Sequence, residues 1–297
     1  LQHGNAECTR CQVLSDTGDI EMTNQQIEDF ANRGFFYAEE ATPKSMVADL
    51  LAAVRRVKQK VRDKEVEIYT HRTDSEEPWA IRGLFAPEFE EPIFSEYLMC
   101  KEIRQTVHHF LGDQLKLGTV LIFTNPHDQD YGFGWHRDFG KLPRDADEEE
   151  ELEILHRPQK SLKWHLALVD DACLQLVPGS HTRYRTDYEQ ECLRRTRNGD
   201  IPGQKTIYLT AGQTVFWHGY TIHRGVMKKD VERLTLAGSW AKYDETDESQ
   251  EVDKRLRWML AENVRPALPE AMKPLYDRWR SQQIDTERPG EDGTHGQ

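Results

Sequence analysis

The hydrophobic positions near the start of the chain follow helical spacing. Thr23 and Gln26 have the spacing of a capping box, and Gly34 stands where a helix commonly ends. Between them, three apolar residues lie on one helical face: Ile27, Phe30 and Ala31. The pattern predicts a short helix from Thr23 to Gly34.

A second helical pattern begins a few residues later. Thr42 is a suitable N-cap residue, and Pro43 suits the first helical position. Apolar residues then recur on one face: Val47, Leu50, Leu51, Val54, Val57 and Val61. We expect a helix here that packs on one face only.

The middle of the chain changes to strand-like spacing. From Glu65 onward, Val66 and Ile68 alternate with acidic residues, and short apolar runs bounded by turn residues follow. The predicted strands are Thr119–Thr124, Leu162–Val169, Leu174–Val177, Thr206–Leu209, Thr214–Trp217 and Leu234–Trp240. So many short strands predict a β-sandwich or barrel.

The two ends of the chain differ from this middle. Helical spacing returns on both sides of Pro266, so we expect helices between residues 253 and 281 that brace the β core. Residues 1–21 and 282–297 lack periodic apolar positions, which predicts a disordered leader and tail around one domain over 22–281. Cys8 and Cys11 have no second ligand pair nearby for zinc and are assigned no role.

Composition narrows the class of protein. Hydrophobic residues make up 37% of the chain and charged residues 31%, as in soluble globular proteins. The apolar runs are strand-sized, so no membrane span is expected. A net charge of −13 argues against nucleic-acid binding, and five cysteines without scaffold spacing favour a reducing, cytoplasmic setting.

One segment is strongly acidic. Seven of the nine residues from Asp145 to Glu153 are Asp or Glu, which is too much like charge to pack without basic partners. We therefore expect an insert over 145–155 that forms a solvated loop. Because it follows a candidate metal-binding strand, this loop is a hypothetical lid over the site.

Two separated segments carry the candidate chemistry. In Trp135-His136-Arg137-Asp138, an imidazole and a carboxylate two residues apart project from one face of a strand. A later strand delivers His223, and two histidines with one carboxylate leave three metal positions open, which suits Fe(II) and O2 activation. His136, Asp138 and His223 are therefore the predicted catalytic metal ligands.

Arg233 follows His223 by ten positions. A guanidinium can hold a remote carboxylate through two parallel hydrogen bonds, so Arg233 is expected to anchor an oxo-acid that chelates the iron. This predicts 2-oxoglutarate as cosubstrate.

The same residues resemble a known family, the phytanoyl-CoA dioxygenase group of iron(II)- and 2-oxoglutarate-dependent oxygenases. Trp135-His136-Arg137-Asp138 resembles the family's Trp-His-x-Asp, and Thr221-Ile222-His223 with Arg233 resembles its distal pair. Between them, Cys173 to His181 resembles the family's Cys-Leu-x-x-x-Pro-Gly-Ser-His block.

This resemblance implies a double-stranded β-helix, or jelly roll, that oxidises a small-molecule substrate, usually by hydroxylation, and releases succinate and CO2. Related halogenases carry a small residue at the position of Asp138, so the presence of this carboxylate disfavours halogenation. Trp164 aligns with a tryptophan near the cosubstrate in relatives, although a plain core role is equally compatible. Arg224-Gly225 replaces the family's Gly-Ser, so a second cosubstrate contact is not expected.

Several alternatives stay open. His218 is the rival to His223, although the ten-residue interval to Arg233 favours His223. The same ligands could serve a zinc-dependent hydrolase, or an inactive jelly-roll binding module. The substrate class is not specified. Candidates to face it are residues 81–85, Arg137, Phe139, Lys141 and the acidic insert. A basic stretch is an alternative candidate for binding an anionic substrate: Arg183, Arg185, Arg194, Arg195 and Arg197.

Overall fold

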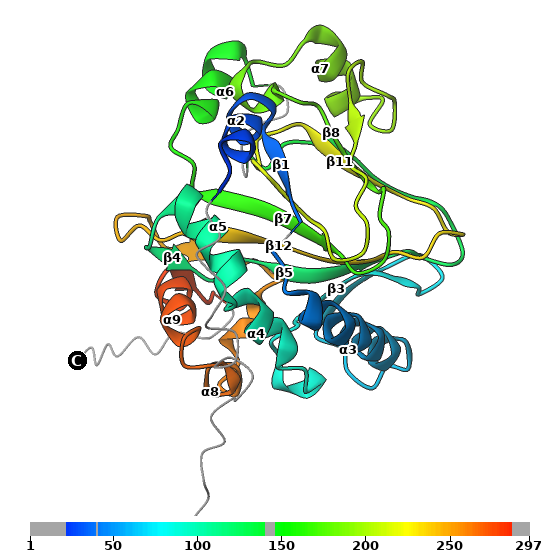
Figure 1. The fold of residues 1–297 in the computed structure, drawn as a ribbon, viewed down its shortest axis with the longest axis vertical. Coiled ribbons are helices and arrows are strands. Elements are labelled where there is room, and N and C mark those ends of the chain that lie inside the picture. Colours follow the sequence, from blue (N-terminus) through cyan, green and yellow to red (C-terminus); the bar gives the residue numbers. More distant parts are fainter. Residues whose placement is uncertain (1–21, 40, 140–145, 287–297) are drawn as a thin grey trace, which may run out of the picture.

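Two antiparallel sheets form the centre of the protein, which we describe from a computed structural model over residues 22–39, 41–139 and 146–286 (Figure 1). The major sheet has the strand order β1 (Phe35–Ala38), β10 (Thr214–Trp217), β7 (Ser161–Ala167), β12 (Leu234–Lys242), β5 (Val120–Thr124), β3 (Pro78–Arg82), β2 (Tyr69–Arg72), with β4 (Leu115–Lys116) on β12. The minor sheet has the order β6 (Tyr131–His136), β11 (His223–Met227), β8 (Leu174–Leu176), β9 (Lys205–Thr206).

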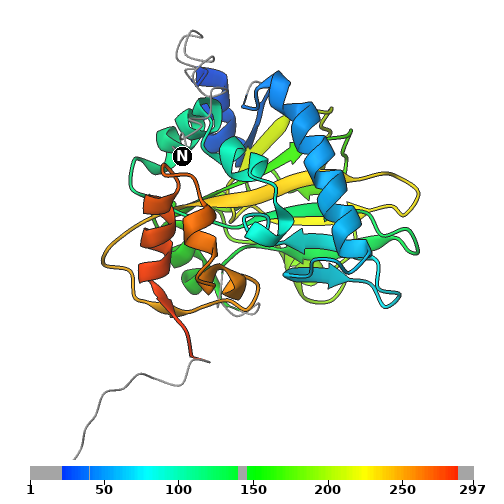
Figure 2. The same cartoon turned by 90° about the horizontal axis from the view of Figure 1, so that it is seen from below.

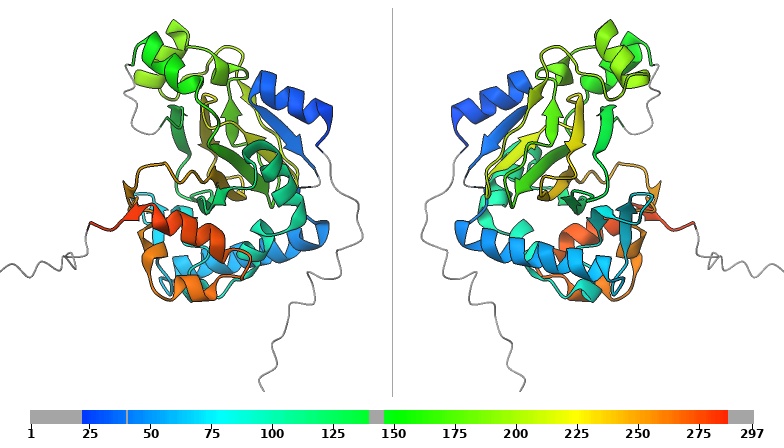
Figure 3. Two further views of the ribbon diagram at one scale, coloured as in Figure 1. Left: turned by 90° about the vertical axis from the view of Figure 1, so that its left-hand side faces the viewer. Right: turned by 90° about the vertical axis from the view of Figure 1, so that its right-hand side faces the viewer.

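Helices cover the outer face of the major sheet. Seen from below in Figure 2, the long helix α3 (Lys44–Arg62) crosses this face beside α4 (Ile93–Leu98), α5 (Lys101–Leu111), α8 (Val264–Ala267) and α9 (Lys273–Ser281). The helices α2 (Asn24–Arg33), α6 (Glu148–Leu155) and α7 (Asp187–Arg194) lie at the other end of the molecule, as the side views of Figure 3 show. Three short 3-10 helices span Pro87–Phe89, Ser180–Thr182 and Arg257–Leu260.

The main hydrophobic core lies between the major sheet and these helices. Along β7 the alternate residues Leu162, Trp164 and Leu166 are fully buried in it, together with α3 residues such as Val54. The intervening residues of β7 face the opposite side, toward the minor sheet, because successive strand side chains alternate. The same sheet therefore supplies the core with one face and a cavity with the other.

The first predicted helix is confirmed. Thr23 caps α2 in a reciprocal capping box with Gln26, and Gly34 ends the helix in the left-handed conformation. Glycine is needed at this position for a second reason. A Cβ atom on Gly34 would lie 2.5 Å from Thr221 Oγ1 and 2.6 Å from His181 Nδ1.

The second helix is confirmed, but it begins at Lys44 with Pro43 as N-cap, not Thr42. The Thr42 hydroxyl lies instead 3.4 Å from both Tyr97 Oη and Thr214 Oγ1 in the buried interior. The Thr42 side chain therefore forms tertiary hydrogen bonds and does not cap the helix.

Most predicted strands match β5, β7, β8, β10 and β12 within two residues. The alternation at Val66 and Ile68 is not a strand, and both residues pack against the core ahead of β2. The strand expected at Thr206–Leu209 is cut short: β9 ends at Thr206, and Leu209 forms only an isolated bridge to Asp171.

The acidic segment is a helix, so the expected loop is wrong for the part that the structure describes. Asp147 caps α6, and acidic residues in the first turn favour a helix N-terminus. Glu151 is buried and forms ion pairs with Arg137, at 3.2 Å, and with Arg185. These arginines supply the basic partners that the local sequence lacks. Asp145 itself lies outside the described residues.

The C-terminal helices are shorter than expected. Two short strands stand before and after them in the sequence, β13 (Gln250–Glu251) and β14 (Gln283–Ile284), and these strands pair in parallel. Regular structure thus extends past Ser281 into the predicted tail. The leader over 1–21 and the tail from 287 onward lie outside the described residues. Among the helices that the structure describes, none has the length and apolar character of a membrane span.

Candidate metal centre

The three predicted ligands meet at one end of the minor sheet. His136 ends β6 and His223 begins β11, and the two residues are direct partners in the register of these strands. Asp138 follows two residues later, where its backbone N–H donates to Gly219 O at 3.0 Å. Strand pairing therefore brings together residues that are far apart in the sequence.

The donor atoms surround a common point. His136 Nε2 lies 3.9 Å from Asp138 Oδ1, and His223 Nε2 lies 3.8 Å from Asp138 Oδ2. One ligand atom from each residue lies within 4.8 Å of the other two. Two nitrogen donors and one carboxylate at this spacing fit a transition-metal ion.

Hydrogen bonds orient both imidazoles. His136 Nδ1 lies 2.9 Å from Gly134 O, and His223 Nδ1 lies 2.8 Å from Thr221 O. A proton on each Nδ1 leaves the Nε2 lone pair directed at the metal point. Burial lowers the pKa of both rings, that of His136 to about 3, so both are neutral at physiological pH.

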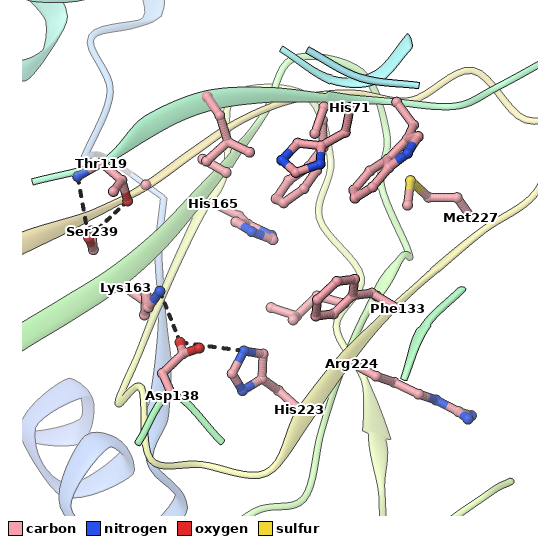
Figure 4. Close-up of a pocket in the computed structure, with 18 of the residues that line it drawn as sticks. His71, Thr119, Phe133, Asp138, Lys163, His165, His223, Arg224, Met227 and Ser239 are labelled. Carbon is pink, nitrogen blue, oxygen red and sulfur yellow. Dashed lines mark hydrogen bonds and ion pairs between the residues drawn. The ribbon is translucent and has the colours of Figure 1, made fainter. Parts of the chain in front are cut away.

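Lys163 is a site residue that our sequence analysis missed. Its Nζ lies 2.9 Å from Asp138 Oδ2, as Figure 4 shows. Burial raises the pKa of Asp138, but Lys163 and the two imidazoles lower it further, so the carboxylate is ionised. The sequence did contain one indication of this role. Lys163 is a lysine among the apolar residues of a predicted strand, at a position that faces away from the core.

His218 lies outside this centre. Its ring contacts His181 and Tyr220, with centroid distances of 5.5 and 4.8 Å. Tyr220 N–H donates to His218 Nδ1 at 3.1 Å. The structure therefore brings His223, and not the rival His218, to His136 and Asp138.

A cavity of about 490 Å³ opens beside the triad and is lined by residues of both sheets. Its walls include His165 and Trp217 near the metal ligands, and Leu121 and Met227 farther along. Figure 4 shows Phe133, Met227 and His71 arranged around the same space as Asp138 and His223. A volume of this size suits small organic molecules.

Arg233 lines the same cavity from the start of β12 and is 3% exposed. Its Nε donates to Asp171 Oδ2 at 3.0 Å, and its guanidinium lies 4.8 Å from the centre of the Phe123 ring. Burial lowers the pKa of Arg233, but Asp171 more than offsets this, so the side chain stays charged. Within the described part of the chain, the two Nη groups donate to no protein acceptor.

Trp164 does not line the cavity, which favours the core role over the contact with a cosubstrate. The ring is fully buried in the main core, where it meets Tyr97 edge to face at 5.7 Å. Its neighbours Lys163 and His165 face the cavity instead. A motif alignment does not reveal which face of a strand a residue occupies. The alternation of apolar and polar residues along β7 does indicate the face.

Arg137 does not line the cavity either, although it stands between two of the predicted metal ligands in the sequence. Its guanidinium donates to Ser180 O and to Tyr220 O, at 2.5 and 2.9 Å, and pairs with Glu151. Arg137 thus fixes the strand that carries His136 and Asp138. Lys141 lies outside the described residues.

The basic stretch after His181 is largely structural. Arg183 pairs with Glu189 at 2.7 Å, Arg185 with the buried Glu151, and Arg195 with Glu191 at 3.5 Å. These pairs anchor α6 and α7, and none of the five arginines lines the cavity.

Comparisons with known proteins agree with this geometry. The sequence profile of the family described as Phytanoyl-CoA dioxygenase (PhyH) matches residues 30–226. No curated protein sequence matches the chain.

Solved structures share the fold at low sequence identity. EctD from S. alaskensis, crystallised with 2-oxoglutarate and 5-hydroxyectoine, has a TM-score of 0.58 and 17% identity over 76% of this chain and 78% of EctD. AviO1 from Streptomyces viridochromogenes Tue57 has a TM-score of 0.54 and 19% identity over 75% of this chain and 95% of AviO1. The carbocyclase SnoK from nogalamycin biosynthesis has a TM-score of 0.54 and 18% identity over 75% of this chain and 85% of SnoK.

The expected fold class, mainly antiparallel sheet in a jelly roll with flanking helices, is therefore confirmed, although the major sheet does not close into a barrel. The expected cofactors are those of the family, Fe(II), 2-oxoglutarate and O2. The chain belongs to the phytanoyl-CoA dioxygenase (PhyH) family, whose members are iron(II)- and 2-oxoglutarate-dependent oxygenases.

Proposed function

We propose that this protein oxidises an unactivated C–H bond of a small molecule, most simply by hydroxylation, with His136, Asp138 and His223 as iron ligands. The observation that carries the proposal is the convergence of these three donors in one cavity with the buried Arg233. Bound Fe(II) and 2-oxoglutarate supply the oxidising chemistry, in which O2 is consumed and succinate and CO2 are released.

The donor set fits Fe(II). Both imidazoles are neutral, each Nδ1 is held by a backbone carbonyl, and the carboxylate is ionised. Three protein ligands on one side leave the opposite side open, where a cosubstrate and O2 have room. A zinc hydrolase on the same three ligands would leave the buried Arg233 of this cavity without a role.

Arg233 is the proposed anchor for 2-oxoglutarate. Asp171 holds its Nε edge, which directs the two Nη groups into the cavity. A guanidinium fixed in this way binds a carboxylate in two parallel hydrogen bonds. Its burial strengthens the interaction, because little water competes for the same groups.

The cavity must hold the cosubstrate and the substrate together, so its volume of about 490 Å³ favours a small substrate. SnoK is a carbocyclase, so this fold also supports oxidative outcomes other than hydroxylation.

Anaerobic titration tests the proposal. Adding Fe(II) and then 2-oxoglutarate to the protein should produce the weak visible charge-transfer band of a chelated oxo-acid. His136→Ala should abolish the band and O2 consumption, whereas the matched variant His218→Asn should retain both. Tight zinc binding without a band in the unmodified protein would favour hydrolysis, and retained activity in His136→Ala would exclude the assigned triad.

A screen of small metabolites would then identify the substrate. Compounds that stimulate succinate formation from 2-oxoglutarate, measured in the presence of Fe(II) and O2, are candidates. A substrate should raise succinate formation above the uncoupled background by at least about tenfold. This rate increase corresponds to a decrease of about 1.4 kcal/mol in the activation free energy.

A further inference from the structure

Arg82 lies at the far end of the cavity from the metal ligands. It ends β3 and lines the same cavity as His136 and His223. Strand pairing places it in one row with His165 on β7, through Ala237 and Leu121. Three strand spacings of about 4.8 Å separate the Cα atoms of His165 and Arg82 by about 14 Å. The distance leaves room for an organic molecule between them.

The charge of Arg82 is only weakly balanced, because Asp253 acts on it electrostatically but is itself bound to Arg255. Among the described residues it pairs with no carboxylate, and its Nε is buried without a hydrogen-bond acceptor. Burial and then Arg255 lower its pKa to about 10, so it remains a cation at neutral pH. A half-buried cation without an ion-pair partner is costly unless a ligand compensates it.

Arg82 differs from the other cationic side chains around the cavity, because it forms no ion pair with a carboxylate in the part of the chain that the structure describes. Five cationic side chains line the cavity, and four have carboxylate partners: Lys163 with Asp138, Arg224 with Asp200, Arg233 with Asp171, and Arg255 with Asp253. A divalent metal ion and a doubly charged 2-oxoglutarate cancel each other. The filled site therefore keeps one positive charge, that of Arg82, in a chain whose net charge is −13.

Arg255 adds positive potential at the same end. It lines the cavity, its Nε and Nη2 groups bind Asp253, and it interacts electrostatically with both Arg82 and Asp138. His71 nearby is neutral, because burial and these two arginines lower its pKa to about 4. The positive charge at this end is therefore held by the two arginines that line the cavity, with Lys254 acting from outside its lining.

The walls between Arg82 and the metal ligands are mixed in polarity. Thr119 and Ser239 form a hydroxyl pair at 3.0 Å, visible in Figure 4, whereas Leu121 and Met227 are apolar. Trp79 adds an aromatic surface, because its ring stacks on Tyr131 at 4.2 Å. Such a lining suits an apolar organic body with one charged group.

We propose that Arg82, assisted by Arg255, binds an anionic group of the substrate, so that the substrate is a small organic acid with a carboxylate or phosphate group. The body of the substrate then lies across the cavity with a C–H bond near the metal ligands. This inference rests on the proposed function, which makes the cavity an oxidation site.

Benzoate and benzamide test the inference, because they have nearly the same shape and differ in charge. Their binding to the protein with 2-oxoglutarate at saturation is measured by calorimetry, without metal and again with Fe(II) under anaerobic conditions. Benzoate should bind at least about tenfold more tightly than benzamide, since a charge-assisted hydrogen bond contributes about 1.5–3 kcal/mol. Phenyl phosphate in the same assay distinguishes a phosphate site from a carboxylate site.

Variants assign the effect to Arg82. Arg82→Gln should remove the preference for benzoate, and Arg82→Lys should keep part of it. Arg233→Gln should keep the preference. Arg265→Gln changes an exposed arginine that pairs with Asp277 outside the cavity and should have no effect. Thermal melting verifies that each variant is folded.

Two outcomes would overturn the inference. One is equal binding of benzoate and benzamide by the unmodified protein. The other concerns the Arg82→Gln variant: it would need more 2-oxoglutarate to form the charge-transfer band, and its preference for benzoate would be unchanged. That result would assign Arg82 to cosubstrate binding. A missing band in the unmodified protein, with the benzoate preference intact, would instead contradict only the proposed function.

Discussion

Single side chains at the metal centre depend on partners that fix their charge and direction. Backbone carbonyls hold the Nδ1 atoms of His136 and His223, and Lys163 holds one oxygen of Asp138. Asp171 does the same for Arg233 at the other side of the cavity. Each of these functional side chains is thus held in place by one neighbouring group.

Replacing Asp171 tests this dependence. Burial raises the pKa of Asp171, but Arg233, Thr235 and His165 lower it further, so its pKa lies below the unfolded value of 3.8. Its contribution to stability is therefore present above about pH 4 and is lost as the pH falls toward the folded pKa. Asp171→Asn leaves Arg233 buried without a counter-charge and should lower the free energy of unfolding by about 3 kcal/mol at pH 7.

Urea denaturation between pH 3 and pH 7 measures this effect. The difference in unfolding free energy between the unmodified protein and Asp171→Asn should be constant near neutral pH and should shrink on acidification. The variant should also need more 2-oxoglutarate to form the charge-transfer band. A difference that grows as the pH falls would contradict the assigned pKa direction.

Gly34 offers a second test at the scale of one residue. Gly34→Ala should destabilise the protein for two reasons, its positive φ of 82° and the clash with Thr221 and His181. We expect a loss of about 3 kcal/mol, with about 1–2 kcal/mol from the backbone alone. Urea denaturation gives the value.

Gly203 is the matched control, because its φ is 81° and a Cβ atom there would meet nothing within 4 Å. Gly203→Ala should therefore show the backbone cost only. Equal losses in the two variants would mean that the contact at Gly34 relaxes freely.

At the scale of elements, α6 shows how a charged segment becomes part of a packed fold. Asp147 and the first-turn glutamates suit the N-terminus of the helix, and Glu151 projects inward to Arg137 and Arg185. Because Arg137 lies between His136 and Asp138 in the sequence, the helix braces the metal-binding strand. This anchoring makes α6 a fixed support and not the mobile lid expected from its composition.

Glu151→Gln should therefore affect both stability and metal binding. The substitution leaves two buried arginines without their carboxylate, and breaking a buried ion pair costs about 3–5 kcal/mol. Loss of orientation at Arg137 should weaken Fe(II) binding by about tenfold or more. Urea denaturation and anaerobic Fe(II) titration give the two values.

Glu153→Gln in the same helix provides the control. Glu153 is exposed and pairs only with Arg157, so the change in unfolding free energy should stay within about 0.5 kcal/mol. If Glu151→Gln were as mild as this control, the bracing role of α6 would be wrong.

At the scale of the whole molecule, the major sheet separates two environments. Its outer face packs on α3, α4, α5 and α9 to form the core, and its inner face meets the minor sheet across the cavity. The proposed ligands come from β6 and β11 and the segment after β6, so a metal ion links chain segments distant in the sequence. Metal binding should therefore stabilise the folded state as a whole.

Metal removal tests this coupling. Fe(II) at about 100 times its dissociation constant, under anaerobic conditions, should raise the free energy of unfolding by about 2.7 kcal/mol. A chelator should reverse the gain, His223→Ala should not show it, and His218→Asn should show it in full. Equal stabilisation of His223→Ala and the unmodified protein would place the metal elsewhere.

The sequence by itself determined the features that depend on local patterns. Capping residues and apolar periodicity located α2 and α3, and alternation located five strands of the two sheets. Motif spacing selected His136, Asp138, His223 and Arg233, which the structure gathers around one cavity. Such features are readable because each depends on residues close together in the chain, or on a motif with fixed spacing.

Only the tertiary structure decided which partners these residues meet. Lys163 and Arg82 reach the cavity, and Asp171 reaches Arg233, through strand order and register, which no local pattern specifies. The acidic segment became a helix because Arg137 and Arg185 neutralise Glu151 from other parts of the chain. The core position of Trp164 follows from the layers packed on the two faces of β7. In each case the deciding energy is an interaction between distant residues, charge pairing or burial, that the chain forms only when folded.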